Sequence, residues 1–162
     1  MTLEGYFARF GEWTTVDNPK EGPRFRESVA KGAFSKTIAE GRGRIKLQLA
    51  HGQDPQVGDN PIGKLSELRE DSHGGFYRAD LFRLPELIED GLRAQQFGAS
   101  FRFSTVREDY TARPPRSDYN VERIPERVLR EVRLFEISAT SWPAYAGTSA
   151  VVRSEGDVIV MR

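Results

Sequence analysis

The sequence predicts an α+β domain built on one antiparallel, barrel-like sheet that is flanked by a few short helices. Segments that alternate apolar and polar residues outnumber helical ones, and Gly- and Pro-rich turns separate them. Two segments alone show the three-to-four-residue apolar spacing of a helix. The chain has 162 residues, of which 38% are hydrophobic, and this suits one domain with a core of modest size.

The N-terminal quarter predicts a strand, a loop and a helix. The strand covers residues 3–11, and residues 17–25 form a loop because proline, glycine and asparagine are concentrated there. Within residues 32–43, Phe34 and Ile38 lie one helical turn apart on the same face. Two glycines near the end of this segment stop the helix.

The middle of the chain predicts a strand that ends at a histidine, then a hairpin and a second helix. Apolar and polar residues alternate through residues 44–51, and His51 continues the apolar phase if the strand stays regular. Residues 61–70 and 74–84 form the two strands of a hairpin across a polar turn. A helix follows over residues 84–98, where leucine and isoleucine line one face.

The C-terminal third predicts strands on either side of a long loop. Residues 99–106 alternate as a strand, and residues 107–126 form a polar, proline-rich surface loop. Residues 127–142 form another strand, and the short apolar segments 150–154 and 157–161 are candidates to pair with each other. We expect the whole chain, residues 1–162, to fold as one domain.

The charge balance and the lack of cysteine exclude several classes of function. The 24 basic and 24 acidic residues cancel, so we expect neither nucleic acid nor a membrane surface as a partner. Without cysteine there are no disulfides, thiolate metal sites or cysteine nucleophiles, which suits a reducing cytosol. The N-terminus lacks the pattern of a signal peptide, and no apolar run reaches the roughly 20 residues of a membrane span.

Two histidines are the side chains best suited to proton transfer at neutral pH. His51 follows an apolar strand, where it either caps the strand or aims a ring nitrogen into a cleft. His73 lies in the predicted hairpin turn, and we interpret it as exposed to solvent. An alternative joins both histidines with Asp54 and Asp59 in a metal site, although their spacing matches no familiar ligand pattern.

Ser100 and Glu136 are the candidates to complete a catalytic set with His51. Ser100 follows a Gly-Ala step that lets a substrate carbonyl approach the backbone, but a lone serine needs an adjacent base to react. Glu136 lies between apolar residues, where a carboxylate is costly to bury without a partner. That partner is either an imidazolium or an arginine such as Arg133, and the residues alone leave both interpretations open.

Four segments, in this order, resemble the tailed-phage prohead maturation serine proteases. The resemblance covers about residues 3–153. It is carried by KGAFSKTI at 31–38, by the histidine block at 45–82, by FGASFRFS at 97–104 and by LFEISATSWPAYAGTSAVV at 134–152. No single segment is very specific to this family, but the four segments in this order are.

The resemblance implies a serine endopeptidase without a cofactor and with a fold similar to herpesvirus assemblin. Such an enzyme acts inside the assembling prohead in the host cytoplasm, or is encoded by a prophage in a bacterium. It cleaves the scaffold and the major capsid protein, which are its partners, and it often cleaves itself. Self-association of the chain stays open.

The resemblance also assigns roles to individual residues. His51 matches the family's histidine and Ser100 its serine, and Glu136 matches the acidic position proposed as the third catalytic member. The chain departs from the family pattern at Arg102, which places a charge where the family often has none. The sequence leaves the role of Arg102 open between substrate preference and contact with an oxyanion.

Two alternatives from other classes make different predictions. A non-catalytic capsid-assembly or scaffold-binding module on the same fold predicts that His51 and Ser100 lie too far apart to hydrogen-bond. It also predicts no labelling by a serine-directed fluorophosphonate. A metal-dependent hydrolase that uses His51 and the nearby aspartates predicts loss of activity with a chelator.

Overall fold

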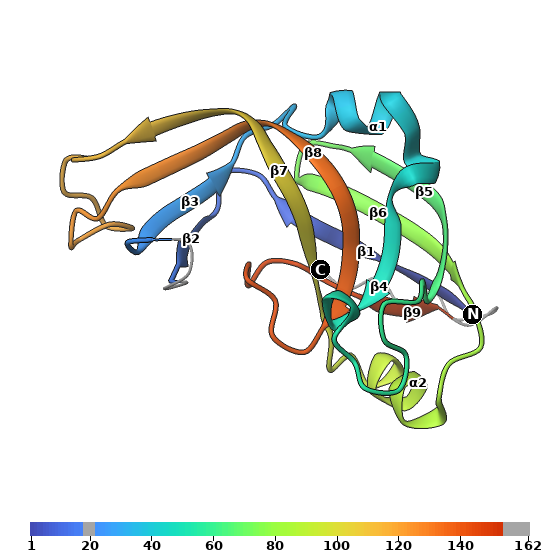
Figure 1. The fold of residues 1–162 in the computed structure, drawn as a ribbon. Coiled ribbons are helices and arrows are strands. Elements are labelled where there is room, and N and C mark those ends of the chain that lie inside the picture. Colours follow the sequence, from blue (N-terminus) through green and yellow to red (C-terminus); the bar gives the residue numbers. More distant parts are fainter. Residues whose placement is uncertain (18–21, 154–162) are drawn as a thin grey trace.

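The computed structural model describes residues 1–17 and 22–153, and a mixed sheet forms its centre (Figure 1). Its strands are β1 (Thr2–Arg9), β2 (Trp13–Val16), β3 (Phe25–Val29), β4 (Lys46–Leu49), β5 (Gly63–Glu70), β6 (Gly74–Leu81), β7 (Gly98–Thr111), β8 (Glu126–Thr140) and β9 (Val151–Arg153). The helices are α1 (Ser35–Gly41) and α2 (Glu86–Arg93), with short 3-10 helices η1 (Arg42–Arg44) and η2 (Ala50–Gly52). Within the described ranges, no helix has the length and apolar character to cross a bilayer.

The predicted α+β class is confirmed, but the prediction of an antiparallel, barrel-like sheet is wrong. The strands follow the order β2-β3-β8-β4-β5-β6-β1-β9, with β7 on β8, and the sheet does not close. β3 and β4 both run parallel to β8. They pair with successive parts of one edge of this 15-residue strand, and α1 lies between them in the chain. The likeness to assemblin stays a prediction.

The predicted strand and helix faces are confirmed where alternation or helical spacing is strong. Ile45, Leu47 and Leu49 are all buried, as expected for one face of the strand at residues 44–51. The helices predicted at 32–43 and 84–98 form as the shorter α1 and α2. The hairpin at 61–84 forms from antiparallel β5 and β6.

Three aromatic rings at the centre of the core fix the start of β7. Phe34 lies 4.8 Å from Phe7 and 5.4 Å from Phe101 between ring centroids, and all three contacts among these rings are edge-to-face. This geometry stabilises aromatic pairs beyond the area they bury. Because Phe101 follows Ser100, the cluster also holds the backbone at the candidate serine.

The loop predicted at residues 107–126 begins later than expected. β7 continues to Thr111 and pairs with β8 as far as Glu126, so both strands project as a long curved hairpin (Figure 1). The sequence did not predict this part of the strand because its exposed side chains are mostly charged and polar and do not alternate with apolar ones. Of the C-terminal segments, residues 151–153 form β9 and pair with β1. The segment 157–161 lies outside the described residues.

A β-bulge in β8 interrupts its alternation beside the candidate acid. Arg102 pairs with Glu136, and the next residue of β7, Phe103, pairs with Leu134. Phe135 therefore has no partner in the ladder, and it is 46% exposed although both flanking apolar residues, Leu134 and Ile137, are buried. The extra residue lets the core face continue on both sides of the bulge.

Candidate active site

Three neighbouring strands carry the candidate residues, since β8 lies between β4 and β7. Ser100 of β7 pairs with Ser138 of β8, and Arg102 pairs with Glu136. Directly opposed residues project from the same face of a sheet, so these four side chains form one group. His51 lies just beyond the end of β4. Residues far apart in the chain therefore meet at one place.

The His51 ring contacts the Glu136 carboxylate directly. Nδ1 of His51 lies 2.5 Å from Oε1 of Glu136, which is 5% exposed. The sequence left an imidazole and an arginine open as partners of Glu136, and the structure supplies both: His51 at Oε1 and, at Oε2, the guanidinium of Arg102 rather than that of Arg133. Because Glu136 occupies Nδ1, the other ring nitrogen, Nε2, is the one left to exchange a proton with a substrate or nucleophile.

Ser138 is a site residue that the sequence interpretation missed. Its side chain is fully buried, and its Oγ accepts a hydrogen bond from the His51 backbone N–H at 2.8 Å. Glu136 and Ser138 are two residues apart on one strand, so they share a face. One holds the ring of the histidine and the other holds its backbone. This Glu-x-Ser spacing was the available signal in the sequence.

His51 stands on a left-handed turn, so the strand does not stay regular as far as the histidine and the condition for its apolar phase is not met. β4 ends at Leu49, and φ is 47° at Ala50, 54° at His51 and 76° at Gly52. Left-handed conformation costs an L-residue roughly 1–2 kcal/mol, and only glycine adopts it freely. Such strain persists only where the surroundings fix it, and it is concentrated at functional sites.

Arg102 supports the same turn from β7. Its Nη2 donates a hydrogen bond to the His51 carbonyl at 3.3 Å, and its Nη1 lies 3.5 Å from Oε2 of Glu136. The guanidinium thus contacts both members of the His–Glu pair. Neither contact involves Ser100, so the contacts of Arg102 are with the His–Glu pair.

Ser100 lies opposite Ser138 of β8, which links it to the rest of the site. It is 7% exposed, and its register partner Ser138 is the residue that holds the His51 backbone. In the described chain no hydrogen bond joins the Ser100 hydroxyl to the His51 ring. The backbone just before the serine is tightly packed, because a Cβ on Gly98 would lie 2.7 Å from Pro143 Cγ.

The other histidine lies away from this group. The His73 side chain is 68% exposed in the turn between β5 and β6, as predicted, and its Nδ1 lies 3.2 Å from Ser72 Oγ. No cluster of three or more His, Asp or Glu side chains suited to a metal ion occurs among the residues that the structure describes.

Comparison with known proteins identifies the family of the chain. A family profile described as "Caudovirus prohead serine protease" matches residues 1–159 of the 162. A search of curated proteins gave no significant match. The matched range contains every residue of the site described above, and it includes nearly the whole chain. The chain therefore belongs to the caudovirus prohead serine protease family, the serine proteases of phage capsid maturation.

Proposed function

We propose that this chain is a serine endopeptidase in which Ser100 is the nucleophile, His51 the general base and Glu136 the residue that orients the imidazole. The observation that carries the proposal is the 2.5 Å contact between His51 Nδ1 and Glu136 Oε1. A carboxylate at Nδ1 fixes the ring and stabilises its charged form, while Nε2 stays available for proton transfer. The position of Ser100 opposite Ser138 supports its assignment.

The reaction follows from these roles. His51 Nε2 takes the Ser100 proton as Oγ bonds to the scissile carbonyl carbon, and backbone N–H groups near Ser100 stabilise the oxyanion. When the C–N bond breaks, Nε2 gives that proton to the leaving amine. Water then attacks the acyl-enzyme ester and loses a proton to Nε2, which returns it to Ser100 as the acid product leaves. Catalytic hydrogen bonds of this kind commonly tighten when substrate binds.

The family assignment supports a specific biological context. We infer that the chain acts inside the assembling prohead in the host cytoplasm, where it cleaves the scaffold polypeptide and the major capsid protein. Self-cleavage belongs to the same inference. A protease confined with its substrates needs no separate targeting step, since the shell itself brings them together.

The test compares two serines of β7. Ser100→Ala should lower cleavage of a scaffold–capsid precursor by about 10⁴-fold or more, because the catalytic residues act as a unit. It should also abolish labelling by a fluorophosphonate. Ser104→Ala removes an exposed hydroxyl of the same strand and should retain both activities.

The same experiment distinguishes the alternative of a non-catalytic assembly module. Circular dichroism and urea unfolding would establish that both variants are folded. Processing by Ser100→Ala at the wild-type rate would contradict the proposal. So would the failure of wild-type protein to react with the fluorophosphonate inside assembled proheads.

A further inference from the structure

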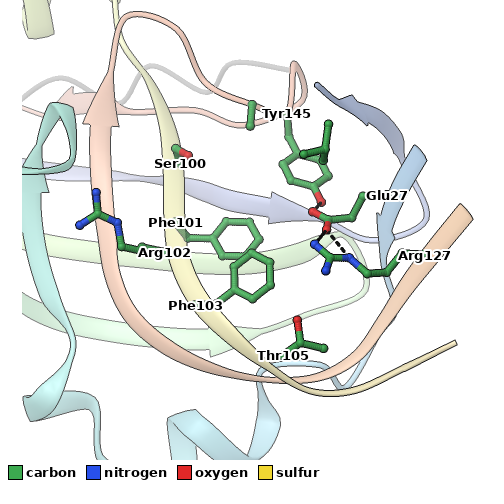
Figure 2. Close-up of a pocket in the computed structure, with 10 residues that line it drawn as sticks. Glu27, Ser100, Phe101, Arg102, Phe103, Thr105, Arg127 and Tyr145 are labelled. Carbon is green, nitrogen blue, oxygen red and sulfur yellow. Dashed lines mark hydrogen bonds and ion pairs between the residues drawn. The ribbon is translucent and has the colours of Figure 1, made fainter. Parts of the chain in front are cut away.

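A pocket of about 370 Å³ extends along β7 from Ser100 to Thr105 (Figure 2). Residues 100–103 all line it, and the opposite side is formed by β2, β3, β8 and the segment after β8. Consecutive side chains of a strand point to opposite faces. A pocket that contacts four residues in a row therefore follows the edge of the strand, and Ser100 lies at one end of it.

This edge of β7 has no strand partner within the described ranges. β7 pairs with β8 alone. No backbone group of residues 98–106 hydrogen-bonds to a described segment other than β8. An unpaired strand edge presents N–H and C=O groups to which an extended peptide can add as a further strand.

Aromatic rings form the apolar wall of the pocket. The ring of Phe101 stacks on Tyr145 with centroids 5.9 Å apart, and it lies 5.1 Å from the ring of Phe103. Figure 2 shows the rings of Phe101 and Phe103 between Ser100 and the far end of the pocket. Phe101 and Tyr145 are buried, whereas Phe103 is half-buried, so the ring of Phe103 presents the surface that an apolar or aromatic side chain would cover.

The charged groups at the far end of the pocket already have partners. Glu27 is 3% exposed and accepts hydrogen bonds from the Tyr145 hydroxyl at 2.5 Å and from Arg127 Nε at 2.8 Å. Burial, together with the negative charge of Glu27, raises the pKa of Tyr145, so its hydroxyl stays protonated and donates. Arg127 also faces Glu108 at 3.5 Å. A charged substrate side chain would have to compete with these hydrogen bonds and ion pairs.

We propose that the open edge of β7 binds the substrate as an added strand and that the pocket holds one bulky apolar side chain of that substrate, aromatic or leucine-like. The pocket extends over five strand positions from the serine, or about 16 Å. The side chain therefore lies within about five residues of the scissile bond, on one side of it. This inference rests on the proposed function and adds a substrate feature to it.

The test measures binding separately from cleavage by using the full chain with Ser100→Ala. A displayed library of short random peptides is selected on this protein, and the selected peptides should share a bulky apolar residue at one position. Adding Thr105→Trp, which fills the pocket, should weaken their binding at least about tenfold. Adding Ser104→Trp, at the neighbouring exposed position outside the pocket, should leave the affinity unchanged.

The outcomes separate this inference from the proposed function. Selection of basic or acidic residues in place of the apolar one, no selection at all, or equal weakening by both substitutions would overturn the pocket assignment. Fluorophosphonate labelling of the chain with its natural Ser100 is measured in parallel. Apolar selection without labelling would reject the nucleophile and retain the pocket, whereas labelling without apolar selection would do the reverse.

Discussion

At the scale of single residues, His51 is held at three separate points. Its ring contacts Glu136, its N–H donates to Ser138 and its carbonyl accepts from Arg102. In the proposed mechanism, a base that is fixed in this way loses little entropy when the substrate arrives. The arrangement also gives Arg102, which departs from the family pattern, a role in positioning the His–Glu pair.

Substitution of Arg102 tests that role. Arg102→Gln removes both contacts of the guanidinium, and we expect kcat to fall about tenfold to a hundredfold with KM nearly unchanged, since small misplacements of a base slow the chemical step. Arg102→Lys should restore part of kcat. Steady-state kinetics on a precursor-derived peptide would measure this, with Arg107→Gln on the exposed part of β7 as the control. A raised KM at constant kcat would instead show that Arg102 binds substrate.

The site was predictable only in part at this scale. The chemistry of the residues identified His51, Ser100 and Glu136 as candidates, and the family resemblance assigned their roles. Ser138 and Arg102 were missed or left open because their shared partner, His51, lies in the turn after β4, 87 and 51 residues away along the chain. Sequence spacing carries no information on such contacts until the pairing of the strands is known.

At the scale of elements, the left-handed turn at η2 predicts that a glycine substitution there raises the stability of the protein. Ala50 has φ of 47°, which glycine adopts without the steric cost of a Cβ. We expect Ala50→Gly to raise the free energy of unfolding by about 0.5 kcal/mol, after the greater chain entropy of glycine is subtracted. Urea unfolding would measure the change.

A matched substitution provides the control for this gain. Ala79 is buried in β6 with no positive φ, so Ala79→Gly should lower the free energy of unfolding by about 1 kcal/mol. An equal loss in both variants would show that the turn stores no strain.

Elements were predicted well where their pattern is local. Alternation located β4 and helical spacing located α2, because burial of one face determines both patterns. The pairing of the strands was not predicted, and this produced the error in sheet type. β3 and β4 meet β8 about 100 and 90 residues further along the chain, and nothing in an alternating segment specifies such a partner. The bulge at Phe135 could not be predicted from the sequence either, since it depends on the facing strand.

At the scale of the whole molecule, the segment after β8 ties the last part of the described chain to the first strands. Its Ser149 exchanges hydrogen bonds with the Tyr6 backbone, and its Tyr145 donates to the buried Glu27 of β3. We expect Tyr145→Phe to lower the free energy of unfolding by about 1–3 kcal/mol, because a buried carboxylate oxygen loses its donor.

Urea unfolding again measures this effect, with another tyrosine as reference. Tyr119 is 44% exposed and stacks on Trp13 through its ring, so Tyr119→Phe should change stability by less than about 0.5 kcal/mol. A loss of similar size in both variants would mean that the hydroxyl of Tyr145 contributes nothing specific.

The position of β8 between β4 and β7 has a consequence for biosynthesis. A ribosome that has translated as far as Ser104 has already made the imidazole and the alcohol, but not the strand that separates and aligns them. Oriented chemistry begins only after Glu136 and Ser138 have left the exit tunnel and joined β4. In the proposed mechanism, the order of translation thus delays the onset of proteolysis until β8 has been synthesised and has paired with β4.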